Sequence, residues 1–381
     1  MLVRDVMNPN VISLSIKDRV GEYISLAEKH HIHEVFVLEK KKLKGMVTHR
    51  TLLKKEMVDP NKEKVGRIME PPPATLKSDD TLEGAAKTLL KTGLRAVPVL
   101  DGKDVVGVIS ITDIVNAVMG MKEFRQTKAE SIMSPAITVS DSSSIGAARA
   151  LMRERNISRV PVIDRGGRLI GIVTIFDMLK NLRSHERMGW KSMGAEMERL
   201  MHIPITTVVN RSPTTSVRSS SLNDLAMTML DQETSGVVIS DRDMPIGVVT
   251  LKDLLEFYVG TLGKEGIYYQ ISGLHDQEEI DMAAELVEAM LKKVSAFAKV
   301  TFFFIHVKKS DIGYKLRARY DVRARLKTDK DIFISHANGW DVRDAVGQCV
   351  SNLERIMLRD KEKRREGFWK RGIRLKEILG G

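Results

Sequence analysis

The segment of this 381-residue chain with the clearest chemistry lies near its carboxyl end, where basic and apolar residues alternate. Between Lys315 and Lys327 every second residue is apolar, which predicts a β-strand with one apolar and one charged face. Neighbours on one face of a strand lie about 6.6–7 Å apart, close to the phosphate spacing along a nucleic-acid strand. Apart from Asp321, the charged face would present Lys315, Arg317, Arg319, Arg323, Arg325 and Lys327.

Two interpretations of this charged face stay open. Charges also solubilise a sheet and protect its edges against pairing with other strands. The charge distribution favours a polyanion partner, because residues 310–381 hold 18 Lys and Arg against 11 Asp and Glu in a chain of net charge +11. A basic segment on a nearly neutral body is typical of proteins that bind polyanions.

A second group of side chains belongs to a short phrase that occurs four times. The phrase is a glycine, two apolar residues and a Ser or Thr, and it begins at Gly45, Gly107, Gly171 and Gly247. In three copies an acid follows three residues after the hydroxyl, in the pairs Ser110 and Asp113, Thr174 and Asp177, and Thr250 and Asp253. The first copy has Thr51 instead. Such a pair suits either a bound ligand or the N-terminus of a helix.

The glycines lie 62, 64 and 76 residues apart, so the repeat defines the architecture. In the second copy, apolar residues at helical spacing predict a helix over 82–92 that ends at Gly93. A strand, a turn at 101–102, a second strand and a second helix follow. The predicted order in each unit is strand, helix, strand, strand, helix.

With this fourfold pattern the chain resembles CBS-domain proteins over roughly residues 1–260. The resemblance implies an α/β fold in which units pair as two Bateman modules, Val3–Gly120 and Ala129–Gly260. The expected CBS units are 1–60, 61–124, 125–183 and 205–262, with a linker helix at 184–204.

The CBS resemblance also implies a ligand, namely AMP, ADP or ATP, with S-adenosylmethionine as the weaker candidate. The hydroxyl and acid pairs named above would bind the ribose hydroxyls, and the adjacent helix N-termini would favour a phosphate. Charge-assisted hydrogen bonds of this kind contribute roughly 1.5–3 kcal/mol each when desolvated. Arg95 and Arg159 would contact the phosphate or the base. Because the first unit lacks the acid, its pair is expected to hold one ligand or none. Many CBS pairs bind nothing and act as dimerisation scaffolds, so that alternative stays open.

After residue 260 the periodicities change and predict the order β-α-β-β-β-α over 266–365. With its segment ISHANGWDVRDAVGQCVSNLERIM, this part resembles the small domain of ribosome hibernation-promoting factors, of the sigma-54 modulation or S30EA type. The resemblance implies binding in the RNA-lined channel of the small ribosomal subunit. The acidic first helix, 276–288, departs from an RNA-binding surface. Further RNA-binding candidates lie at the last helix end and in the basic tail 366–381: Lys361, Lys363, Arg364, Arg365, Lys370, Arg371 and Arg374.

Other sequence features argue against several classes of protein and of site. Cys349 is the single cysteine, which argues against disulfides and thiolate metal sites, and no apolar stretch is long enough for a membrane span. No Walker loop, GxSxG or HExxH motif is present. We therefore predict a non-enzymatic, cytoplasmic translation-silencing factor of the stress response that requires no cofactor or metal. It would bind the small ribosomal subunit and its rRNA, and its CBS part would sense adenine nucleotide, form a homodimer that bridges subunits, or do both. The alternative is a nucleotide-gated regulator of a protein or DNA target.

Overall fold

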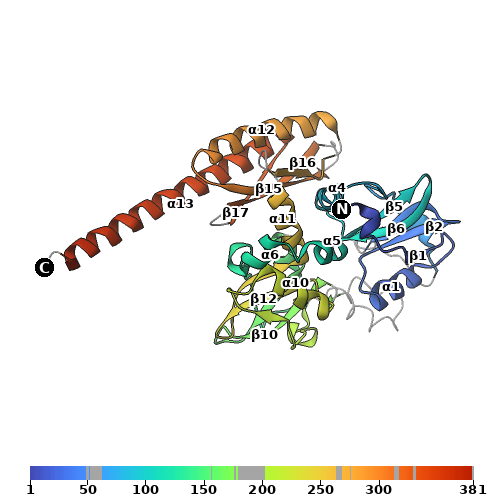
Figure 1. Ribbon diagram of the computed structural model, residues 1–381, viewed down its shortest axis with the longest axis horizontal. Coiled ribbons are helices and arrows are strands. Elements are labelled where there is room, and N and C mark those ends of the chain that lie inside the picture. The colour runs from blue at the N-terminus through green and yellow to red at the C-terminus, as the bar shows by residue number, and fades with distance from the viewer. Residues whose placement is uncertain are drawn as a thin grey trace. The chain divides into compact units, whose positions relative to one another are not determined.

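The structure is a computed structural model that describes residues 1–48, 51, 62–155, 157–175, 177–178, 202–262, 268–274, 276–312, 317–328 and 332–379. The chain divides into two compact units, an amino-terminal unit Met1–Tyr258 and a carboxy-terminal unit Val259–Gly381 (Figure 1). The predicted linker helix at 184–204 falls outside the described residues except for its last three positions.

The amino-terminal unit contains the four repeats. Repeat 1 contains β1 (Ser13–Leu14), α1 (Val20–Lys29), β2 (Glu34–Glu39) and β3 (Lys42–Thr48). Repeat 2 contains α3 (Val65–Ile68), β4 (Leu76–Lys77), α4 (Leu82–Thr92), β5 (Ala96–Asp101), β6 (Asp104–Ser110) and α5 (Ile111–Val118). Repeat 3 contains β7 (Ser134–Pro135), β8 (Val139–Ser140), α7 (Ile145–Arg155), β9 (Arg159–Ile163) and β10 (Leu169–Thr174). Repeat 4 contains β11 (Thr215–Ser216), α10 (Leu222–Asp231), β12 (Gly236–Asp241), β13 (Met244–Thr250) and α11 (Leu251–Leu262).

Helix α4 illustrates how the local sequence determines where a helix of the repeats begins, where it ends and which face it buries. Thr81 caps its N-terminus by accepting a hydrogen bond from the Gly84 amide at 3.1 Å, and Gly93 ends it in the left-handed conformation with φ of 67°. The apolar residues of α4 point into the core: Leu82, Ala85, Ala86, Leu89 and Leu90. The predicted order of elements is confirmed in repeats 2 and 4.

Repeats 1 and 2 form the first pair, and repeats 3 and 4 the second. In the first pair one sheet runs in the order β1-β2-β3-β6-β5-β4. In each repeat the leading segment also forms backbone hydrogen bonds with the other repeat of its pair. Asn8 and Val108 exchange backbone hydrogen bonds of 2.8 and 2.9 Å, and Met46 and Glu70 exchange bonds of 2.8 and 3.0 Å. The second pair repeats this exchange between Ile172 and Asn210, and where β7 pairs with β13.

The exchanged segments explain the glycine at the start of each repeated phrase. A Cβ on Gly107 would lie 2.7 Å from Met7 Sδ, and one on Gly171 would lie 2.4 Å from the Asn210 carbonyl oxygen. Real side chains do not tolerate such distances, so the glycine makes room for the partner repeat's segment to cross the strand. The repeated phrase is therefore part of the pairing scaffold.

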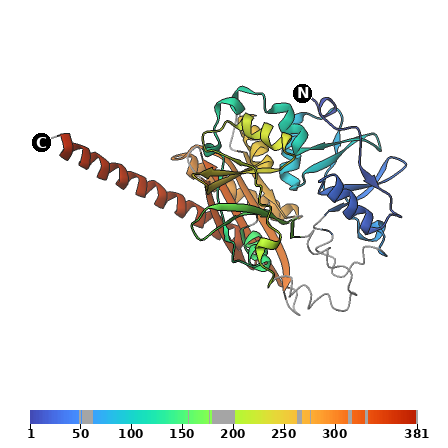
Figure 2. The ribbon, with the colours of Figure 1, turned by 90° about the horizontal axis from the view of Figure 1, so that it is seen from below.

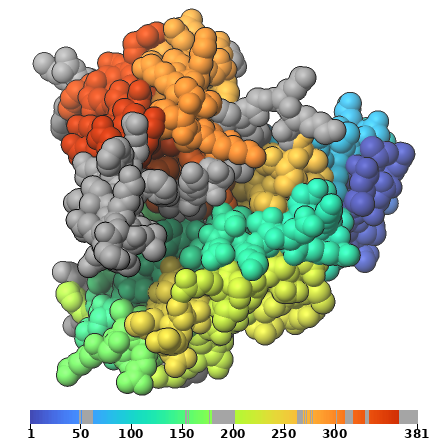
Figure 3. Space-filling view, turned by 60° about the vertical axis from the view of Figure 1, so that its left-hand side comes forward, coloured from blue at the N-terminus to red at the C-terminus, as the bar shows by residue number. Residues whose placement is uncertain are grey.

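A short helix, α6 (Lys122–Gln126), leads from repeat 2 into repeat 3. It lies beside α10, where the Leu222 amide donates to the Thr127 carbonyl at 2.9 Å. Figure 3 shows these two segments next to one another on the surface, in teal-green and yellow-green. Phe124 of α6 is fully buried and meets Phe257 of α11 edge-on at a centroid distance of 5.2 Å. This aromatic contact ties the connection to repeat 4.

The carboxy-terminal unit has the predicted β-α-β-β-β-α order. Its elements are β14 (Tyr268–Ser272), α12 (Gln277–Ser295), β15 (Val300–Ile312), β16 (Arg317–Thr328), β17 (Ile332–Gly339) and α13 (Val342–Leu379). The sheet order is β14-β15-β16-β17, with β14 parallel to β15 and the other neighbours antiparallel. Asp276 caps α12 by accepting from the amides of Glu278 and Glu279.

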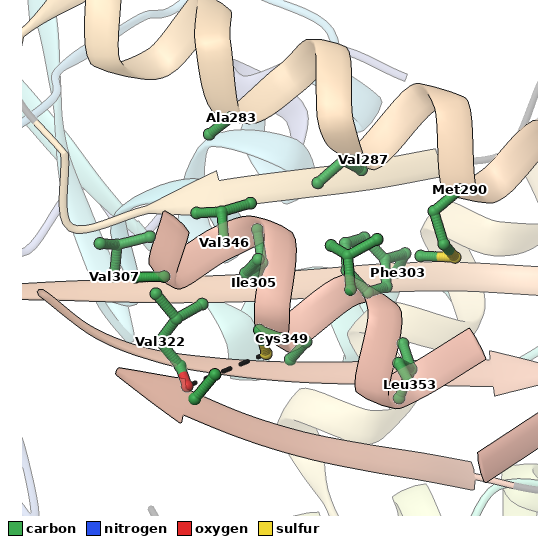
Figure 4. Packing of buried hydrophobic residues seen from close by; sticks show 14 of the residues in the cluster. Ala283, Val287, Met290, Phe303, Ile305, Val307, Val322, Val346, Cys349 and Leu353 are labelled. Carbon is green, nitrogen blue, oxygen red and sulfur yellow. Dashed lines mark hydrogen bonds between the residues drawn. The ribbon is translucent and has the colours of Figure 1, made fainter. Parts of the chain in front are cut away.

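Both helices pack on one face of this sheet (Figure 4). The core joins residues of α12, such as Val287, to Phe303 of β15, Val322 of β16 and Leu353 of α13. The last residue of α13 in this core is Met357, although the helix continues to Leu379, beyond the sheet, in both Figure 1 and Figure 2. The predicted basic tail 366–381 is thus, as far as residue 379, a continuation of α13.

Candidate functional sites

The three hydroxyl and acid pairs lie at junctions between a strand and a helix. Ser110 ends β6, and its amide and hydroxyl both donate to Asp113 Oδ2, at 2.8 and 2.6 Å. The Asp113 amide donates back to Ser110 Oγ at 3.2 Å. Thr174 with Asp177 and Thr250 with Asp253 have the same geometry. These bonds form a capping box, so Oδ2 of each acid serves its helix and a ribose would have to use Oδ1.

The first copy makes the corresponding hydrogen bonds without an acid. The amide of Thr51 donates to Thr48 Oγ1 at 3.1 Å, and the two hydroxyls lie 3.1 Å apart. Thr51 is buried. This position offers no carboxylate to a sugar, as the sequence indicated.

Arg95 and Arg159, which the sequence analysis treated separately, meet in the structure. Arg159 Nη2 donates to Ser235 Oγ at 2.7 Å, and Arg95 Nη1 donates to the same oxygen at 3.3 Å. Arg95 belongs to the first pair, whereas Arg159 and Ser235 belong to repeats 3 and 4 of the second. Two guanidinium groups from different pairs therefore converge on one hydroxyl.

The backbone register explains how Arg159 reaches this place. Arg159 lies opposite Thr174 in repeat 3, and Gly236 lies opposite Thr250 in repeat 4, so the two are matching positions of paired repeats. A Cβ on Gly236 would lie 2.1 Å from Arg159 Nη1. The guanidinium thus occupies the space of a missing side chain. Ser235 and Gly236 were not among the residues predicted from the sequence. The available signal was a glycine in SGVVI at the place of the arginine in SRVPV.

Repeat 1 has an acid at the matching position. Glu34 lies opposite Thr48, and its Oε1 accepts a hydrogen bond from the Arg95 amide at 3.3 Å. The first pair therefore presents a carboxylate where the second presents a guanidinium. An anionic ligand would be repelled at the first position and attracted at the second.

The surroundings of the two arginines disfavour their charge. Burial, and after it the nearby charge of Arg95, lower the pKa of Arg159 to about 10, while Asp253 and Asp177 oppose the shift. Burial also lowers the pKa of Arg95, against the opposing charge of Glu34. Arg159 is only 8% exposed, and its Nε has no hydrogen-bond partner among the described residues. Buried cations of this kind are stabilised by an anion.

The strand β16 has the alternation that the sequence predicted. Tyr320, Val322, Ala324 and Leu326 face the helices and the core. Four basic residues lie on the other face: Arg319, Arg323, Arg325 and Lys327. Arg325 is opposite Phe304 on one side and Ile334 on the other, and its Cζ lies 5.8 Å from the centre of the Phe302 ring.

Arg323 is opposite His306 and His336 on the same face. The basic stripe is thus interleaved with rings, which the sequence analysis did not identify. The alternation in VTFFFIHVKK was the available signal, because it places Phe302, Phe304 and His306 on one side of β15.

The expectation that Lys327 is displayed on the surface was wrong. Lys327 is 7% exposed, and the register places it opposite Phe302, which is itself only 5% exposed. Lys315 lies outside the described residues, and Arg317 begins β16. Lys361 places its Nζ 4.7 Å from the centre of the Phe297 ring. The other basic candidates lie along the backbone of α13: Lys363, Arg364, Arg365, Lys370, Arg371 and Arg374.

Among the described residues, no three His, Cys, Asp or Glu side chains gather where they could hold a metal ion. None of the helices that the structure describes is both long and apolar enough to cross a membrane.

Comparisons with known proteins agree with this division of the chain. A family model described as "CBS domain" matches residues 3–57, 65–120, 129–184 and 205–260. A second family model, described as "Hibernation factor Hib, C-terminal domain", matches residues 269–373. The first set covers the four repeats, and the second covers the carboxy-terminal sheet with its two helices.

Two proteins of Methanocaldococcus jannaschii are similar to the chain. Uncharacterized protein MJ1404 is 28% identical over 316 residues, which cover 81% of this chain and 74% of that protein. Uncharacterized protein MJ1225 is 23% identical over 198 residues, covering 51% of this chain and 70% of its own length. The crystal structure of MJ1225 matches with a TM-score of 0.56 at 18% identity, over 68% of this chain and 100% of that one. This likeness supports the fold of the repeats.

Proposed function

The chain belongs to the CBS-domain family and carries a carboxy-terminal domain of the hibernation-factor Hib type, and from this premise we propose that it silences translation by binding the small ribosomal subunit. The Hib-type match carries the proposal, because it spans residues 269–373. Both types of domain are regulatory rather than catalytic. In this proposal the protein acts in the cytoplasm, where the ribosomes are, during stress.

The basic and aromatic face of β15, β16 and β17 is the proposed rRNA contact. Guanidinium groups bind phosphates and release counterions, whereas rings stack on unpaired bases. On this face Arg323 lies between His306 and His336, and Arg325 lies opposite Phe304. Basic residues beside rings support an RNA partner better than a protein partner.

Co-sedimentation with ribosomes through a sucrose gradient at low salt tests the proposal. The wild-type chain should travel with the small subunit, and the double variant Arg323→Glu, Arg325→Glu should stay at the top. The matched control is Arg67→Glu with Arg168→Glu, whose side chains are exposed in the amino-terminal unit. Absence of the wild-type chain from the ribosomal fractions would refute the proposal.

The CBS half is proposed to sense an adenine nucleotide, AMP, ADP or ATP. The second pair is the stronger candidate, because it combines the two acids Asp177 and Asp253 with Arg159. We also propose that the CBS half forms a homodimer that bridges two ribosomal subunits. Analytical ultracentrifugation of the full chain, with and without AMP, tests this part separately, and a monomer at every concentration would contradict it.

A further inference from the structure

We propose that Asp321 and Asn338 recognise the base of an unpaired guanine nucleotide on the basic and aromatic face of β15, β16 and β17. This inference rests on the RNA-binding function proposed above for that face. It adds a preference for one base, because the arginines of β16 can recognise only the phosphates that every RNA sequence shares.

The register of the sheet places the two side chains next to each other. Asp321 of β16 lies opposite Asn338 of β17, and the pair Arg323 and His336 lies two residues further along the same face. Side chains directly opposite each other on antiparallel strands have their Cβ atoms about 4.5–5.5 Å apart. Asn338 is exposed and Asp321 is partly buried. A single nucleobase is wide enough to contact both.

The carboxylate of Asp321 interrupts the basic face without an internal partner. Lys308 of β15 lies opposite it on the other side, yet within the part of the chain that the structure describes the Asp321 side chain has neither an ion pair nor a hydrogen bond. The Asn338 amide has no hydrogen-bond partner among those residues either. A carboxylate repels the phosphates that Arg319 and Arg323 attract. Its complement on an RNA is therefore a group that donates hydrogen bonds.

The Watson–Crick edges of the four bases differ in the donors that they offer to a carboxylate. Guanine has two adjacent donors, N1–H and N2–H, which match the two oxygens of the Asp321 carboxylate. Its O6 accepts a hydrogen bond from an amide such as that of Asn338. Adenine, cytosine and uracil each offer a single donor group on this edge, next to acceptors that a carboxylate repels. Because a duplex occupies the same edge, the ligand is an unpaired guanine.

Groups around the pair fit the rest of the nucleotide. Arg319 and Arg323 lie on either side of Asp321 along the same face of β16, each about 6.6–7 Å away, where they can bind the flanking phosphates. Trp340 follows β17 directly and is 60% exposed. An exposed indole ring can stack on any base, so it adds affinity without sequence preference.

Fluorescence anisotropy of the full chain with short, labelled, single-stranded RNAs tests the inference. Two RNAs of equal length carry either central guanines or central adenines among uridines. We expect the wild type to bind the guanine RNA about tenfold more tightly, as one extra hydrogen bond to a charged group implies. In Asp321→Asn this preference should disappear, and the adenine RNA should bind more tightly, because a repelling charge is removed. The control Glu278→Gln removes an exposed charge from α12 and should keep the preference.

The direction of these changes separates base recognition from simple repulsion. If Asp321→Asn tightens the binding of both RNAs equally, the carboxylate only repels phosphate and the inference is overturned. Equal binding of the two RNAs by the wild type would overturn it as well. The same sequences made as DNA test the ribose. If the effect of Asp321→Asn is absent with DNA, the carboxylate binds the 2′-hydroxyl and the guanine assignment is wrong.

A second variant tests the stacking part of the site. Trp340→Leu should weaken the guanine RNA and the adenine RNA by a similar factor, about fivefold or more, because stacking is tolerant of sequence. Unchanged affinity for both RNAs would show that the base does not stack on Trp340. If the wild-type chain binds neither RNA, the inference fails, while ribosome co-sedimentation still reports separately on the proposed function.

Discussion

At the scale of residues, the missing side chain of Gly236 leaves the space that the Arg159 side chain occupies. The guanidinium lies 2.1 Å from where a Cβ would stand on Gly236. Ser235, the neighbouring residue, then accepts its hydrogen bond. A glycine in a strand usually weakens the sheet, so its presence at the start of β12 indicates a close approach by another group.

Replacing this glycine should therefore affect ligand binding more than folding. In Gly236→Ala the new methyl group displaces the Arg159 guanidinium, and we expect AMP affinity to fall about tenfold, the loss of one charged hydrogen bond. Calorimetry measures the affinity. Gly347→Ala is the control, because apart from the adjacent turns of α13 itself no described atom lies within 4 Å of the new Cβ. It should stabilise the helix by about 0.5–1 kcal/mol and leave AMP affinity unchanged. Unchanged affinity in Gly236→Ala would remove Arg159 from the site.

Cys349 provides a residue-scale prediction for the carboxy-terminal unit. Its thiol is fully buried, its Sγ lies 3.9 Å from the Val322 carbonyl oxygen, and burial raises its pKa to about 11. At pH 8 only about one thiol in a thousand is then a thiolate, the reactive form. A colorimetric thiol reagent should react with the native chain far more slowly than with the chain in urea. Fast reaction of the native chain would show that α13 does not pack on the sheet as described.

At the scale of elements, each repeat exchanges its leading segment with the other repeat of its pair. The segment around Asn210 crosses Gly171, and the segment around Met7 crosses Gly107. The two crossings differ in what a new side chain would meet. At Gly171 the nearest atom is a backbone oxygen, whereas at Gly107 it is the flexible end of a methionine.

This difference predicts unequal costs for the same substitution. Gly171→Ala should lower the free energy of unfolding by about 2 kcal/mol or more, because backbone must move. Gly107→Ala should cost less, because the Met7 side chain can rotate away. Urea unfolding followed by circular dichroism compares the two variants directly. Equal costs would indicate that the crossing segments do not determine the choice of glycine.

The elements that could be predicted from the sequence are those whose pattern lies within one continuous segment of the chain. Leu82 to Leu90 repeat at helical spacing, and the alternation in β16 needs no partner to be recognised. The exchange of leading segments could not be predicted, because residues 2–8 carry no periodicity, and their long-range bonds go to Ser78, Asp80 and Val108. The contact of Arg95 with Ser235 likewise depends on how two pairs pack. The burial of Lys327 could not be predicted either, because the alternation in β16 does not show which residues of β15 lie opposite it.

At the scale of the whole molecule, the uneven charge is the property that an experiment can follow. The chain carries a net charge of +11, and most of the excess lies in residues 310–381. Binding to RNA releases counterions, so the logarithm of affinity falls linearly with the logarithm of salt, by about 0.7–0.9 for each phosphate contact. The slope therefore counts contacts, independently of the affinity itself.

We expect the affinity of the full chain for a labelled rRNA fragment to fall steeply between about 50 and 200 mM salt. In the double variant Arg323→Glu, Arg325→Glu the slope should decrease by about 1.4–1.8, because two contacts are lost. Fluorescence anisotropy measures the slope. The variant Arg67→Glu, Arg168→Glu has the same change in net charge, but its reversed charges lie in the amino-terminal unit, so its slope should equal that of the wild type. If both double variants reduce the slope equally, RNA is attracted by the total charge of the protein and the sheet face has no specific role.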